Sequence, residues 1–165
     1  MKTPLQKTSD PVVKRACVRA QRRSRLHVVC PRVLPPGRTS GIQYASRVGG
    51  HTGPARSYSM HLTTKSLRRK SDRSQPGHWS VAGATDPKVL RTELGHGRPR
   101  PRNVTLDGFS VEEFVMPPYP RGGVHGGHVV FVWQGRGAAY LVSVHDPANR
   151  ARAVEIATDL VRRTR

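Results

Sequence analysis

Aromatic residues are scarce in this sequence of 165 residues, and so are hydrophobic residues in general. Phe, Trp and Tyr make up 5% of the chain, and all hydrophobic residues together make up 35%. Glycine and proline contribute 16 and 14 residues, which is typical of chains that do not pack along their whole length. We therefore expect part of the chain to be disordered.

Long apolar runs are absent as well. No segment approaches the roughly eighteen apolar residues of a membrane-spanning helix, and the N-terminal segment lacks the continuous apolar core of a secretory signal. We expect a cytoplasmic protein without a membrane span. The arginine-rich, acid-poor N-terminus also resembles an organelle transit peptide in composition.

The chain has only two cysteines. Cys17 and Cys30 lie thirteen positions apart, with no CxxC pair and no nearby cluster of further metal ligands. They could form one disulfide, but nothing in the sequence marks the chain as secreted. We expect two reduced thiols.

Positive charge is what the sequence has in excess. The formal net charge is +19, and residues 1–76 hold 17 basic residues against 2 acidic ones. Such a field attracts nucleic acid and other polyanions, because binding releases condensed counterions. A solvated charge run is the competing interpretation. The candidate nucleic-acid-binding residues form two clusters, Arg22, Arg23 and Arg25, and Lys65, Arg68, Arg69 and Lys70.

Residues 1–76 show neither a persistent helical period nor a persistent strand period, because Arg, Pro, Gly and Ser interrupt every apolar run. We expect this segment to be disordered. The same composition is what an unselected or mis-started reading frame in GC-rich DNA would encode. A non-functional N-terminal extension is therefore an alternative to a functional basic tail.

Residues 77–165 have the signals of a small folded α+β module. Asp86 and Pro87 suit the start of a helix, and Gly95 suits its end. Further along, β-branched and aromatic residues alternate around turn residues. We expect a short strand at 78–81, further strands at 104–106, 109–115, 128–134 and 138–145, and a C-terminal helix at 147–163 that begins at Asp146-Pro147.

Two turns fix the strand register. The pair Asp107-Gly108 places Leu106 opposite Phe109, and the pair Arg136-Gly137 places Trp133 opposite Tyr140. The second hairpin, over residues 128–145, then has one fully apolar face, which the apolar stripe of the C-terminal helix can cover. The predicted fold is a small antiparallel sheet with a C-terminal covering helix, after a long disordered basic segment.

Three histidines form the one candidate metal site. The register sets His128 opposite His145, and His125 precedes them in a glycine-rich loop. Three imidazoles can bind zinc or copper, although strand-end histidines are more often half-exposed residues without a ligand. The adjacent pair Glu112-Glu113 implies no acid–base pair, since neighbouring residues of a strand point to opposite faces.

No motif points to an enzyme or to a cofactor. We expect a non-enzymatic binding or accessory protein whose residues 1–76 associate with nucleic acid or another polyanion, while residues 77–165 contact a protein partner. The alternative is a stand-alone α+β domain with a non-functional extension. A metal-dependent activity of His125, His128 and His145 is the third hypothesis.

Overall fold

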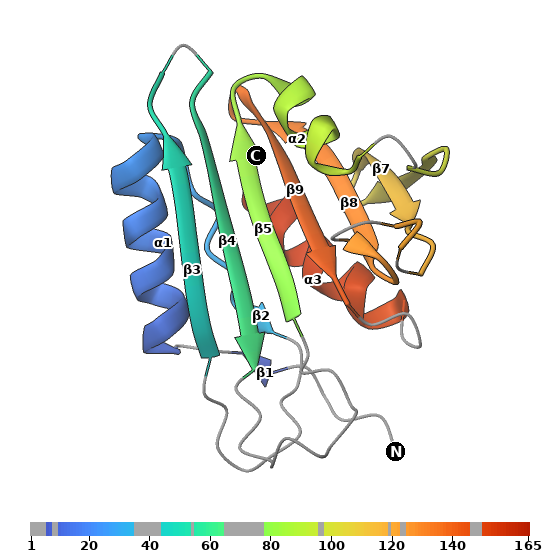
Figure 1. The fold of residues 1–165 in the computed structure, drawn as a ribbon, viewed down its shortest axis with the longest axis horizontal. Coiled ribbons are helices and arrows are strands. Elements are labelled where there is room, and N and C mark those ends of the chain that lie inside the picture. The colour runs from blue at the N-terminus through green and yellow to red at the C-terminus, as the bar shows by residue number, and fades with distance from the viewer. Residues whose placement is uncertain are drawn as a thin grey trace.

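The computed structural model describes residues 6–7, 10–34, 44–53, 55–64, 78–95, 98–118, 120–122, 125–145 and 150–165. Its main element is a seven-stranded antiparallel sheet with the order β3-β4-β5-β9-β8-β7-β6 (Figure 1). A second, two-stranded sheet pairs β1 with β2. The elements are β1 (Gln6–Lys7), α1 (Pro11–Ser24), β2 (Val33–Leu34), β3 (Tyr44–His51), β4 (Ser57–Thr64), β5 (His78–Ala84), α2 (Pro87–Glu93), β6 (Arg102–Leu106), β7 (Phe109–Val115), β8 (Val129–Gly135), β9 (Ala138–Val144) and α3 (Arg150–Arg162).

The helices lie on both faces of the sheet. The buried side chains of α1 and α3 belong to one hydrophobic cluster, and those of α2 belong to a second cluster on the opposite face (Figure 1). The predicted α+β class is therefore confirmed. Among the described residues, no helix is long and apolar enough to cross a membrane.

The centre of the sheet is buried on both sides. Every residue of β9 is buried, with Tyr140 and Val142 in the cluster under α1 and α3 and with Leu141 in the cluster under α2. Side chains alternate between the two faces of a strand, so β9 is apolar without a break.

Both predicted hairpins are confirmed with their register. Leu106 pairs with Phe109, and Trp133 pairs with Tyr140. In each turn both central residues have positive φ, 50° and 82° at Asp107 and Gly108 and 42° and 71° at the second turn. This is the backbone of a two-residue turn whose twist matches that of the strands.

The predicted helix after residue 86 is also present as α2. The Asp86 carboxylate accepts a hydrogen bond from the Lys88 amide at 2.9 Å, and Gly95 has a φ of 75° just after the helix. The C-terminal helix α3 spans Arg150–Arg162, within the predicted 147–163. The start predicted at Asp146-Pro147 lies outside the described residues.

The prediction that residues 1–76 are disordered is wrong for α1, β3 and β4. At the start of α1, the Asp10 carboxylate accepts hydrogen bonds from the amides of Val12 and Val13 at 2.7 and 3.2 Å. The buried side of the helix carries mostly small side chains at helical spacing. They are Val13, Ala16, Cys17, Ala20 and Ser24.

The sheet also continues across the expected boundary at residue 77, because β4 pairs with β5 along its length. Tyr58, Met60 and Leu62 alternate along β4 and are buried under α1. α1 comes close to the neighbouring strand at Gly50, where a Cβ atom would lie 2.6 Å from that of Arg23. The predicted small sheet is therefore a seven-stranded one, completed by N-terminal residues.

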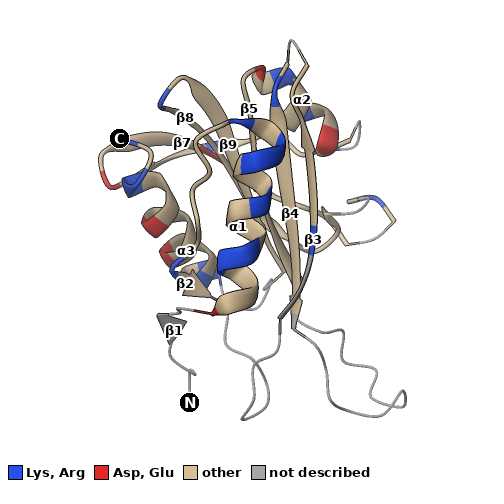
Figure 2. Ribbon diagram, turned by 90° about the vertical axis from the view of Figure 1, so that its left-hand side faces the viewer, with Lys and Arg blue, Asp and Glu red and all other residues tan. Residues whose placement is uncertain are grey.

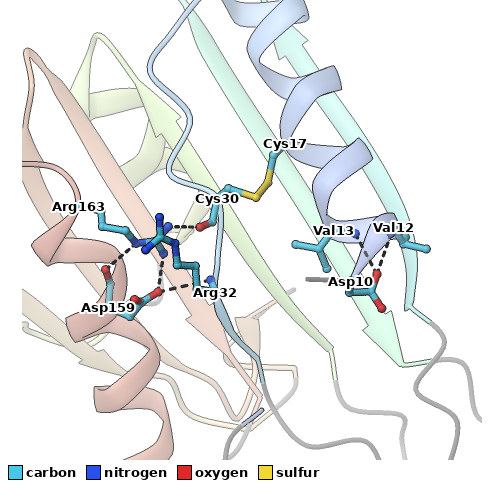
Figure 3. The surroundings of a disulfide bond; sticks show 8 residues. All are labelled: Asp10, Val12, Val13, Cys17, Cys30, Arg32, Asp159 and Arg163. Carbon is cyan, nitrogen blue, oxygen red and sulfur yellow. Dashed lines mark hydrogen bonds and ion pairs between the residues drawn. A yellow bond between two sulfur atoms is a disulfide. The ribbon is translucent and has the colours of Figure 1, made fainter. Parts of the chain in front are cut away.

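Cys17 and Cys30 form a disulfide, whereas the sequence favoured two reduced thiols. The bond joins α1 to the segment 26–34, whose other side contacts α3 (Figure 3). There the Arg163 guanidinium donates to the Cys30 carbonyl, and the Arg32 amide donates to the Asp159 carboxylate at 3.4 Å. The segment thus ties together the two helices that cover one face of the sheet.

A buried carboxylate holds the start of α3 against β6 and β7. Glu113 is 2% exposed and pairs with Arg102, at 2.8 Å, and with Arg150. Burial alone would raise the pKa of Glu113, but hydrogen bonds from Arg150 and Arg102 outweigh it and lower the pKa below its usual value. Glu113 is therefore ionised in the folded protein.

We expect loss of the disulfide to lower the free energy of unfolding by about 3 kcal/mol, because a loop of this length no longer restricts the unfolded chain. The comparison is urea denaturation of the native protein with the Cys17→Ala/Cys30→Ala variant. Dithiothreitol should destabilise the native protein and leave the variant unchanged. Equal stability of the two proteins would contradict the link between α1 and segment 26–34.

We expect Glu113→Gln to lower the free energy of unfolding by about 2 kcal/mol at pH 7, because charge-assisted hydrogen bonds to two arginines are weakened. The folded pKa is depressed, so this stabilisation is complete above the unfolded pKa of about 4.3 and is lost as the pH falls through the folded value. The difference between wild type and variant should shrink in acid.

The neighbouring substitution Glu112→Gln is the control. Glu112 pairs with Arg91 at 2.8 Å, but this pair is open to solvent. Its loss should cost under about 1 kcal/mol. If both substitutions lower the free energy of unfolding equally in urea denaturation, the buried ion pairs of Glu113 do not stabilise the fold more than the exposed pair does.

Candidate functional site

Basic side chains cover the outer side of α1. The buried side of this helix packs on β3 and β4, and its basic positions lie mainly on the rest of its surface, with Arg23 at the edge facing β3 (Figure 2). Arg15, Arg19 and Arg22 follow one another at helical spacing, and the helix itself contains no acidic residue. The basic face consists of Lys14, Arg15, Arg19, Arg22, Arg23 and Arg25, all exposed.

The first predicted nucleic-acid cluster falls on this basic face. Arg22 and Arg23 lie in the last turn of α1, where cations also interact well with the helix dipole. The Arg23 guanidinium donates to the Val48 carbonyl at 2.9 Å, while Arg25 ends the helix with a φ of 55°. The second predicted cluster, Lys65, Arg68, Arg69 and Lys70, lies outside the described residues.

A second group of polar side chains lies on the face of the sheet that carries α2. Ser143 pairs with Val130 on one side and with Ser80 on the other. Val130 belongs to the cluster under α2, so Ser143 and Ser80 beside it also face α2. Every second side chain of a strand points to the same face, so His145, His128 and His78, each two positions from one of these residues, lie on this side too. The histidine cluster consists of His78, His125, His128 and His145, and His61 of β4 lies beside it.

Hydrogen bonds connect His125 to His128 through Ser143, and His128 directly to His78. The Ser143 hydroxyl is fully buried and lies 2.8 Å from Nδ1 of His125 and 2.7 Å from Nδ1 of His128. On its other side, Nε2 of His128 lies 2.8 Å from Nε2 of His78. The rings of His78 and His145 stack with centroids 4.6 Å apart.

Proton counting restricts this chain of hydrogen bonds to two arrangements when the rings are neutral. The single Ser143 proton goes to one Nδ1 atom, so the other Nδ1 must carry a proton and donate to the hydroxyl. If His128 donates from Nδ1, its Nε2 is an acceptor facing His78. If His128 accepts there, its Nε2 donates to His78. The direction of proton donation along these hydrogen bonds can therefore reverse, with every donor and acceptor exchanging its role.

Burial keeps the central rings uncharged. It lowers the pKa of His128 to about 3, with further lowering by His78, His145 and His125. Burial also lowers the pKa of His125, and that of His61, which has Arg47 beside it. Neutral imidazoles at neutral pH can accept hydrogen bonds or bind metal ions through a lone pair.

The structure thus brings together the three histidines that the sequence singled out. The rings of His128 and His145 lie 4.9 Å apart, and those of His125 and His128 lie 5.9 Å apart. Sequence reasoning missed His78, which reaches the cluster through the pairing of β5 with β9. Within the described part of the chain, no three His, Cys, Asp or Glu side chains already have the arrangement of a metal site.

A cavity of about 1000 Å³ lies elsewhere, between α1 and α3 beside the disulfide. Its lining includes Asp159 and Arg163, which pair with each other at 2.5 Å. These charges serve the contact between α3 and segment 26–34. We assign no ligand to this cavity.

Comparison with known proteins adds no assignment. No family model, no curated protein and no solved structure matches this chain. Any functional conclusion must come from the residues themselves.

We expect stability to fall as the pH drops from about 6.5 towards 3, because the unfolded chain then binds protons that the folded His128 does not. The contribution is complete above the unfolded pKa of about 6.5. Urea denaturation across this range should show a smaller pH dependence for His128→Gln. His27→Gln, at an exposed histidine, is the control and should keep the wild-type slope. Parallel curves for all three proteins would exclude this role of His128.

Proposed function

We propose that this chain is a non-enzymatic protein that binds nucleic acid or another polyanion through the basic face of α1. The observation that carries the proposal is the alignment of exposed cations along one helix without an acidic residue among them. Lysine and arginine side chains in such a row neutralise phosphates and release their counterions.

The dimensions of the basic face suit a charged polymer. From Lys14 to Arg25 the helix rises by about 16 Å at 1.5 Å per residue. A stretch of duplex DNA of that length carries about ten phosphate charges. Six cations facing a denser row of anions give attraction without any reading of the base sequence.

The attachment of α1 to the rest of the fold supports the same function. Buried Val13, Ala16 and Ala20 pack the helix on the sheet, and the Cys17–Cys30 disulfide holds it from the side. The cations are therefore presented from a fixed helix, so binding does not have to order the backbone.

The alternative is a stand-alone α+β domain with a non-functional N-terminal extension. Against it stands the pairing of β4 with β5, together with the packing of α1 on β3 and β4. An extension without a role would not be expected to complete the hydrophobic core. A protein partner for residues 77–165 remains an additional hypothesis that no contact of the described residues favours.

The cellular compartment is a separate question. The sequence favoured the cytoplasm, but disulfides seldom persist in its reducing environment. The Cys17–Cys30 bond therefore favours an oxidising compartment over the cytoplasm.

We expect the protein to bind a fluorescent DNA duplex with an affinity that falls steeply with salt. Six phosphate contacts would give a slope of log K against log salt of about −5. Arg15→Gln/Arg19→Gln/Arg22→Gln should lower the affinity and reduce the slope by about 2 to 3, measured by fluorescence anisotropy in a NaCl series.

The matched control is Arg98→Gln/Arg100→Gln/Arg121→Gln, which removes the same charge from exposed positions outside α1. This variant should retain most of the affinity and most of the slope. Equal losses in the two triple variants would mean that only net charge matters. Unchanged binding after removal of the α1 arginines would refute the role of the basic face.

A further inference from the structure

The histidine cluster carries an inference that is independent of the basic face. Two ring nitrogens, Nε2 of His78 in β5 and Nε2 of His128 just before β8, lie 2.8 Å apart. Two nitrogens that bind one tetrahedral zinc ion at 2.0–2.1 Å lie about 3.4 Å apart. If the two nitrogens move apart by roughly half an ångström, one zinc ion can bind both of them.

We propose that His78 and His128 bind a divalent transition metal ion of the zinc class through their Nε2 atoms. Imidazole nitrogens select zinc, copper and nickel over calcium and magnesium, which prefer oxygen ligands. Both cysteines are held in the disulfide, so no thiolate of this chain competes for the ion.

Ser143 supplies the supporting contact that a histidine ligand needs. Its hydroxyl lies 2.7 Å from Nδ1 of His128 and can accept the proton there, which leaves the Nε2 lone pair facing His78. The same hydroxyl then donates to Nδ1 of His125 at 2.8 Å. One of the two proton arrangements therefore orients His128 for metal binding, and Ser143 is its positioning residue. In that arrangement the His78 proton lies on Nε2, so metal binding requires the tautomer of His78 that carries its proton on Nδ1.

The third ligand comes from His145. Its ring lies 4.6 Å from that of His78 and 4.9 Å from that of His128, centroid to centroid. The stacked ring is partly buried and must rotate to direct a nitrogen at the ion. Water would complete a four-coordinate site, as in zinc sites that keep one position open.

The test is equilibrium dialysis of the untagged, disulfide-bonded full chain against Zn²⁺ in the presence of a competing chelator, followed by elemental analysis. We expect one zinc ion per chain. His78→Gln should weaken binding more than about tenfold, and Ser143→Ala should weaken it about 10- to 100-fold, because the orienting contact is lost. His78 is only partly buried, so its variant should fold, which circular dichroism checks.

The matched control for His78→Gln/His145→Gln is His27→Gln/His51→Gln, which removes two exposed histidines outside the cluster. The control should keep its zinc and the visible absorption of a Co²⁺-substituted site, and the cluster variant should lose both. Wild type that retains no more zinc than His78→Gln overturns the proposal. So does an equal loss in the control variant, because zinc would then bind surface histidines.

Discussion

Burial of both faces of the central strands is the constraint on which this structure depends. β9 is buried at every residue, so each face of the sheet needs its own apolar cover. α3 contacts β8 and β6, and α1 contacts β3 and β4, so neither helix alone covers the face that they share. The N-terminal half of the chain is therefore a necessary part of the core, despite its charge.

Turn residues and helix-end residues made the C-terminal hairpins and α2 predictable from the sequence. The turns at Asp107-Gly108 and Arg136-Gly137 determine their hairpins, since a two-residue turn sets the register of the strands beside it. Asp86 and Gly95 mark the ends of α2 in the same local way. These turn and helix-end signals depend only on neighbouring residues, so they can be recognised even in a sequence of unusual composition.

What the sequence did not reveal depends on distant pairing. α1 begins with the pair Asp10-Pro11, the same start that identified α2, but its buried side is small and its arginines suggested disorder. β4 alternates Tyr58, Met60 and Leu62 with polar residues, yet only its pairing with β5 gives that alternation a core to face. His78 joined the histidine cluster through the same long-range pairing, which no spacing in the sequence encodes.

The two candidate sites use opposite faces of one sheet. The basic face lies on α1, whose inner side belongs to the first hydrophobic cluster, whereas Ser143 and the histidines lie on the side of α2. The tightly packed strands between them would separate a polyanion bound on α1 from a metal ion bound at His78 and His128. Coupling between the two sites would require a change in the strands themselves, and strands buried on both faces resist such a change. We therefore expect substitutions at one proposed site to leave binding at the other unchanged.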